Sequence, residues 1–220
     1  MPKLDNPVTA EYLKENLRPD HPRLGLTPQR EADIRSRLET DPVLQNVFQA
    51  LKLDAEEILG DPLLTRKQVG RRLLSVSREM LRRINVLGFL YRMEKSPAIL
   101  DRIHDELLAV AAFRDWNPSH FLDVAEMSMA VALGLDWTAG DLPEDSFNTI
   151  QAALIEKGLR TDNGSTRIVA GTNNWNQVCT GGMIAAALAV SEVEPDLAAD
   201  AISRALDAIP NALSHYAPDG

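Results

Sequence analysis

The chain has 220 residues, of which 45% are hydrophobic, a composition typical of a globular domain and not of a disordered or fibrous protein. Its net charge of -9 and pI near 5.0 argue against a nucleic-acid-binding protein, because nonspecific affinity for phosphates requires a basic excess. Cys179 is the single cysteine and the four histidines show no i, i+4 pairing, so we expect no disulfide, no structural metal and no cofactor.

No apolar run approaches the roughly 20 residues of a membrane span, so no membrane partner is expected. The N-terminus lacks the apolar core of a signal peptide. As written, the sequence predicts a soluble protein that is not exported, whereas a periplasmic or secreted location applies if a leader has been removed. Residues 1–26 contain four prolines and are predicted to form an extended arm with at most one short helix, near Thr9 to Leu17.

Helix-start signals and apolar periodicity then predict a series of helices of about 15 residues. Their approximate ranges are 27–39, 42–58, 65–93, 96–110, 119–135, 143–159, 174–190 and 195–209. The third is expected as one helix or two, with an interruption near residues 85–88. In the second, one face carries Val43, Val47, Leu51, Ala55 and Ile58.

No stretch shows sustained period-two alternation, so no strand is expected beyond Ile168-Val169. The fold class predicted is all-α. Helices joined by short loops with Pro or Gly suggest antiparallel hairpins in series, as in a solenoid or a closed toroid. Residues 125–135 and 183–190 are apolar nearly all round, which favours an inner layer enclosed by outer helices.

The most unusual stretch is Thr172-Asn-Asn-Trp-Asn-Gln-Val-Cys-Thr-Gly-Gly-Met183, which runs directly into an apolar helical pattern. Its amides and hydroxyls cost free energy if they are buried without partners. The stretch therefore indicates either a polar pocket for a ligand or a polar N-cap region that precedes a core helix.

A second constellation is Phe113-Arg-Asp-Trp-Asn-Pro-Ser-His-Phe-Leu-Asp-Val-Ala-Glu126. Its loop carries Asp115, Trp116 and Asn117, and His120 follows at the start of a helix. Aromatic faces stack on pyranose rings and amides bind hydroxyls, so these four residues and Trp175 are candidates for sugar binding. The alternative is a capped turn with a buried Trp116 and with His120 satisfied by Asp123 or by a backbone carbonyl.

In this order, the two constellations and several shorter pieces resemble the heparinase II/III family of polysaccharide lyases and lyase-like proteins. The shorter pieces are His21-Pro-Arg-Leu-Gly-Leu-Thr27, Ser77-Arg-Glu79, Gly134-Leu-Asp-Trp137 and Tyr216-Ala-Pro-Asp-Gly220. The resemblance covers about residue 21 to the end of the chain.

The resemblance implies an N-terminal α/α toroid followed by a large antiparallel β-sandwich, with uronic-acid-containing polysaccharide cleaved by β-elimination between the two. Family members continue beyond Tyr-Ala-Pro-Asp-Gly into a stretch with the catalytic tyrosine. We therefore expect residues 27–220 to be an incomplete toroid of roughly seven to nine helices, truncated at its C-terminus and inactive alone. The expected partners are the missing β-sandwich of the same protein and an acidic polysaccharide or oligosaccharide.

β-Elimination requires the uronate carboxylate to be neutralised and the developing enolate to be stabilised. An amide or a protonated histidine suits this task, and in the family an Asn or His of the toroid performs it. The resemblance maps this role to Asn174 and Asn176, the catalytic candidates. Trp175 and Asn176 stand where some lyases have histidine, so the base and the neutraliser both stay open. Tyr216 is one candidate base, although its place before Pro-Asp-Gly favours a structural role.

Two other functions stay open. An α/α-toroid hydrolase would use carboxylates such as Asp115, Asp123 or Glu126 as acid and base. A noncatalytic carbohydrate-binding or scaffold module would need neither a catalytic acid nor a catalytic base.

Three smaller features complete the predictions. Gly181-Gly182 permits close helix packing or the approach of a ligand to the backbone, and Cys179 is expected to be a buried small residue. Arg71, Arg78 and Arg82 are predicted to share a helical stripe, either facing an anionic substrate or, as is more usual, paired with acids such as Glu79.

Overall fold

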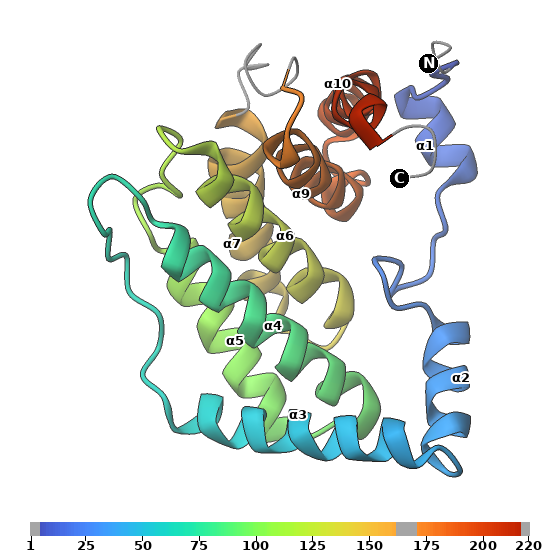
Figure 1. The fold of residues 1–220 in the computed structure, drawn as a ribbon, viewed down its shortest axis with the longest axis vertical. Helices are drawn as coiled ribbons and strands as arrows, with labels where there is room; N and C mark the ends of the chain where they lie inside the picture. The colour runs from blue at the N-terminus through green and yellow to red at the C-terminus, as the bar shows by residue number, and fades with distance from the viewer. Residues whose placement is uncertain (1–4, 162–170, 217–220) are drawn as a thin grey trace.

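The computed structural model describes residues 5–161 and 171–216 (Figure 1). In chain order the elements are α1 (Ala10–Asn16), α2 (Pro28–Leu38), α3 (Pro42–Gly60), α4 (Leu74–Glu94), α5 (Pro97–Ala111), α6 (Phe121–Trp137), α7 (Glu144–Ala153), the π-helical turn η1 (Leu154–Gly158), the 3-10 turn η2 (Leu159–Thr161), α9 (Asn174–Val190), α10 (Pro195–Leu213) and the 3-10 turn η3 (Ser214–Tyr216). No strand occurs within the described residues, so the predicted all-α class is confirmed. The predicted strand residues Ile168-Val169 lie outside them.

Two helix starts follow directly from local sequence. The Thr27 hydroxyl accepts a hydrogen bond from the Arg30 backbone N–H at the start of α2, and the Asp41 carboxylate accepts two backbone N–H groups at the start of α3. A proline occupies the first helical position in both cases, where its missing N–H costs nothing. On α3, Ala55 and Ile58 are buried as expected, whereas Val43 and Val47 lie at the flank of the apolar stripe and are exposed.

The predicted helix over 65–93 starts later than expected. Helix α4 begins at Leu74, the residues before it form a loop, and the helix is continuous to its end. Gly70 has a φ of +59°, a left-handed conformation that interrupts a helix. The Leu73 backbone N–H donates to the Asp123 carboxylate at 2.6 Å. A long-range contact therefore replaces the local helical bonds that the apolar pattern suggested.

Helices α4, α6 and α9 form a central row with α6 in the middle (Figure 1). Helix α5 packs against α4 and α7, α7 against α6, α10 against α9, and α3 against α4. Every residue of α6 except Met129 is buried, which confirms the inner position expected from its apolar sequence. This layered packing of helices is compatible with part of an α/α toroid.

The three central helices run in the same direction, as the order of their contacts shows. Along α4 and α6, Ser77 binds the Asp123 carbonyl near the helix starts, and Gly88 packs on Trp137 near the ends. Along α6 and α9, His120 contacts Trp175, and Ala125 contacts Gly182. The N-termini of all three helices therefore lie at one end of the row.

The N-terminal segment is extended between α1 and α2, as predicted, but it is firmly attached. The buried Asp136 carboxylate, near the end of α6, accepts hydrogen bonds from His21 Nδ1 at 2.6 Å, the Arg23 N–H at 2.9 Å and the Leu24 N–H at 2.8 Å. Trp137 donates its indole N–H to the Leu24 carbonyl at 2.8 Å. The segment His21-Pro-Arg-Leu24 thus anchors the arm to the central row.

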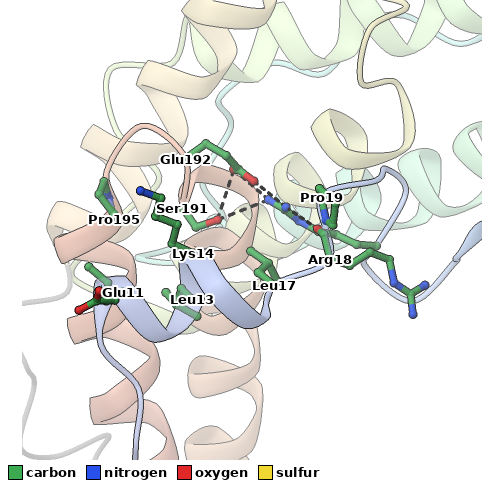
Figure 2. A pocket seen from close by; sticks show the side chains of 11 residues that line it. Glu11, Leu13, Lys14, Leu17, Arg18, Pro19, Ser191, Glu192 and Pro195 are labelled. Carbon is green, nitrogen blue, oxygen red and sulfur yellow. Dashed lines mark hydrogen bonds and ion pairs between the residues drawn. The ribbon is translucent and has the colours of Figure 1, made fainter.

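The arm also bridges to the turn between α9 and α10 (Figure 2). The Arg23 side chain is only 3% exposed and donates to both Glu192 oxygens at 2.6 and 2.9 Å and to the Leu188 carbonyl at 2.6 Å. Burial acts to raise the pKa of Glu192, but the bond and charge of Arg23 hold that pKa below its ordinary value. A pocket of about 680 Å³ lies beside this pair, between α1 and the turn, with Leu13 and Leu17 in its wall.

We expect Asp136→Ala to lower the free energy of unfolding by about 3 kcal/mol, because it leaves two backbone N–H groups and a histidine without their acceptor. Urea unfolding at neutral pH measures this change. Asp101, an exposed residue of α5, gives the control, since Asp101→Ala removes the same charge from the surface and should change stability little. Equal effects of the two substitutions would contradict the anchoring role of Asp136.

Candidate functional site

The N-terminal ends of α4, α6 and α9 bring the two unusual sequence stretches together. The loop over residues 113–120 leads into α6, and residues 172–173 lead into α9. The His120 and Trp175 rings meet edge to face, with centroids 5.0 Å apart and an interplanar angle of 77°. Aligned peptide dipoles make a helix N-terminus favourable for negative charge, so three of them at one end favour an anionic ligand there.

Trp116 does not take the predicted place at a sugar-binding surface. Its side chain is fully buried, and its indole N–H donates to the Val110 carbonyl at 3.0 Å. One edge of the ring also lies over Gly158. Because no face of the ring is open to a ligand, we correct the assignment of Trp116 from a stacking platform to a core residue that holds the 113–120 loop.

Asp115 and Asn117, also predicted to bind substrate, stabilise the loop instead. Asp115 accepts from the Arg66 guanidinium at 2.6 Å and from the Asn117 N–H at 2.8 Å. Burial acts to raise the pKa of Asp115, but these bonds hold it below its ordinary value. Asn117 is buried at a φ of +64°, and its amide donates to the Arg71 carbonyl at 2.8 Å and to Asp123 at 2.6 Å.

His120 and Asp123 form a buried pair at the centre of this end. His120 is 4% exposed and Asp123 is fully buried, with His120 Nδ1 2.7 Å from Asp123 Oδ1. The other carboxylate oxygen accepts from the Leu73 N–H and from the Asn117 amide, both at 2.6 Å. These bonds leave the Asp123 carboxylate able to orient the imidazole ring through Nδ1.

The second ring nitrogen of His120 is unusual. Nε2 is buried and has no hydrogen-bond partner within the described parts of the chain. A buried polar atom without a partner costs free energy, so such an atom indicates either a strained core or a group held ready for a ligand. Trp175, partly exposed in the first turn of α9, is the aromatic neighbour of this ring.

The two catalytic candidates on α9 point to different sides of the helix. Asn174 is exposed at the first helical position. Asn176 is fully buried and donates its side-chain amide to the Ala208 carbonyl of α10 at 3.0 Å. Residues two apart on a helix do not share a face. The prediction that Asn174 and Asn176 both face a substrate carboxylate is therefore wrong for Asn176, whose side chain joins α9 to α10.

The remaining sequence candidates also have clear positions. Cys179 is buried as predicted, and Tyr216 is exposed in η3. Arg82 pairs with Glu79 and Asp54, the paired alternative considered above. The prediction that Arg71, Arg78 and Arg82 share a helical stripe is wrong for Arg71, which lies in the loop before α4.

The pairing of His120 with Asp123 was one of the alternatives predicted from the sequence, since the two residues are three positions apart. The contributions of Leu73 and of the Arg78–Glu126 pair were missed, since the first comes from a backbone group and the second joins two helices. The regular spacing of His120, Asp123 and Glu126 was the feature of the sequence that could have pointed to the Arg78–Glu126 pair.

Within residues 5–161 and 171–216, no group of three or more His, Cys, Asp or Glu side chains is arranged to hold a metal ion. None of the described helices has both the length and the apolar character needed to cross a membrane. Comparison with protein-family models and with curated proteins gives no match to the chain.

Proposed function

We propose that this chain is the N-terminal helical part of a polysaccharide lyase, which cleaves uronic-acid-containing polysaccharide by β-elimination. The observation that supports this function is the buried His120, held by Asp123 through Nδ1 and left without a partner at Nε2. It lies where three helix N-termini favour a negative charge. The family resemblance of the same two stretches adds to this support.

In this proposal His120 and Asn174 face the uronate carboxylate. With Nδ1–H donated to Asp123, the imidazolium form of His120 has one N–H left, at Nε2, for a carboxylate oxygen of the substrate. The exposed amide of Asn174 supplies further donors at the start of α9. Neutralising the carboxylate lets negative charge develop on it when the C5 proton leaves.

The elimination itself has three linked parts. A base takes the C5 proton, the electron pair forms a C4–C5 double bond, and the glycosidic bond at C4 breaks as its oxygen gains a proton. As the resemblance implies, we assign the base to a tyrosine that follows residue 220. The residues of this chain bind and polarise the uronate.

A ligand reaches Nε2 only after a neighbouring group has moved, because this atom is buried. Trp175 is placed for such a movement, since its ring contacts the imidazole and is partly exposed. Its position in the first helical turn leaves it fewer backbone restraints than the middle of α9 has. In the proposal, the displaced indole then packs beside the bound sugar.

The hydrolase alternative loses support from the same geometry. A hydrolase needs one carboxylic acid that is protonated when it meets the glycosidic oxygen. Asp115 is paired with Arg66, and Glu126 is paired with Arg78. Asp123 is fully buried and already accepts three hydrogen bonds. All three carboxylates thus act as acceptors within the fold.

An absorbance assay tests the proposed function. The chain, alone and within the longer protein that contains it, is incubated with a panel of uronate polymers and with a neutral polymer. We expect far-ultraviolet absorbance of an unsaturated uronate from the longer protein, with one or more uronate polymers and not with the neutral one. Absence of this absorbance with every uronate polymer would rule out the lyase.

A further inference from the structure

Helix α4 carries four arginines that pair with carboxylates, and Arg82, Arg83 and Arg92 use all of their guanidinium nitrogens within the fold. Arg82 binds Glu79 and Asp54 through its three guanidinium nitrogens. Arg83 is buried and uses all of its nitrogens, binding Glu79, Glu106, Asp61 and the Pro62 carbonyl. These two side chains fasten α4 to its surroundings and have no donor nitrogen left without a bond.

Arg78 is held in a different way. Its Nε donates to both oxygens of Glu126, at 3.1 and 3.3 Å, while Glu126 itself is only 10% exposed. The Arg78 side chain is 63% exposed, and its terminal nitrogens Nη1 and Nη2 have no partner within the described residues. A largely buried carboxylate therefore fixes the guanidinium from behind, so that two parallel donors face outward.

We propose that Arg78 binds the carboxylate of a second uronate unit in the polysaccharide and so determines the preference for an anionic chain. This inference rests on the proposed function. Glu126 lies six residues after His120, about 9 Å along the helix axis, so we assign its partner Arg78 to a different carboxylate from the one that His120 binds. A polymer lying along α6 brings one uronate to His120 and another to Arg78.

The chemistry favours arginine at this position. A guanidinium presents parallel N–H groups that match the two oxygens of a carboxylate, whereas an ammonium is a single point of charge. Lysine at residue 78 would pair with Glu126 but would have no oriented fork left for a ligand. Arg78→Lys therefore separates the pairing within the fold from the binding of substrate.

Isothermal titration calorimetry of the 220-residue chain with a galacturonate hexamer tests this role. We expect Arg78→Gln to weaken binding about tenfold or more, and Arg78→Lys to weaken it severalfold while thermal unfolding stays unchanged. Arg37→Gln is the matched control, because Arg37 is an exposed arginine of α2 paired with Asp41 and its loss changes the net charge equally. A neutral hexasaccharide of glucose should bind no more tightly to the wild type than to Arg78→Gln.

Two results would overturn the role of Arg78. One is wild-type affinity for the hexamer in both Arg78 variants, and the other is no binding of the hexamer by the wild type. The absorbance assay keeps the proposed function separate: elimination with unchanged affinity in Arg78→Gln removes this inference alone. Binding that depends on Arg78 without any elimination removes the lyase alone.

Discussion

Gly182→Ala is expected to lower the free energy of unfolding by about 3 kcal/mol or more, whereas Gly181→Ala should leave it unchanged or raise it slightly. A Cβ on Gly182 would lie 2.3 Å from the Ala125 carbonyl oxygen and 2.8 Å from its carbon. Both are backbone atoms of the central helix α6, so neither can rotate away. Relief requires α6 and α9 to separate, which opens space along their whole contact.

The adjacent glycine makes the comparison unusually well matched. Both residues lie within α9, and alanine is favoured over glycine there by about 1 kcal/mol. Only the position of the new methyl group differs. Urea unfolding followed by circular dichroism gives both values, and a Gly182→Ala protein as stable as Gly181→Ala would contradict the close crossing of α6 and α9.

In the proposed lyase, His120→Ala should reduce the rate of elimination by about 10²- to 10⁴-fold, which is the range for loss of a group that handles charge or protons in the transition state. The reason is the loss of the imidazole that Asp123 holds through Nδ1 and whose Nε2 faces the substrate in the proposal. Because the substitution removes an imidazole and leaves its space, added imidazole should restore part of the rate. A purely structural histidine would show no such rescue.

His104→Ala provides the control for this experiment. His104 lies on α5, and its Nε2 is also buried without a partner in the described part of the chain. Loss of this histidine tests the general effect of removing an imidazole from a partly buried position. We expect normal elimination by His104→Ala, and an equal loss of rate in both variants would contradict a special role for His120.

Much of the fold follows from local sequence, because its signals are short-range. Thr27 and Asp41 cap helices that start close to the predicted residues 27 and 42, and the apolar sequence of α6 correctly predicts a central helix. The late start of α4 was not predictable in this way. The Leu73 N–H is bound by Asp123, fifty residues further along the chain, and no local pattern contains that bond.

The sequence predicted which segments form the candidate site more accurately than it predicted which side chains do. Both unusual stretches do meet, at His120 and Trp175. Residue type alone did not distinguish Trp116 in the core from Trp175 at the ring of His120, since an indole suits either place. Asn176 was misassigned for a similar reason, because its amide satisfies a carbonyl of α10 as well as it would satisfy a ligand.

The mass of the products from a uronate polymer tests the central claim most directly. β-Elimination divides the chain without adding water, so each cut yields a new non-reducing end that is lighter by one water than the corresponding hydrolysis product. We predict this lighter, unsaturated series from the protein that contains the chain, and its loss in His120→Ala. Products of hydrolytic mass, or no products from any uronate polymer, would contradict the assignment.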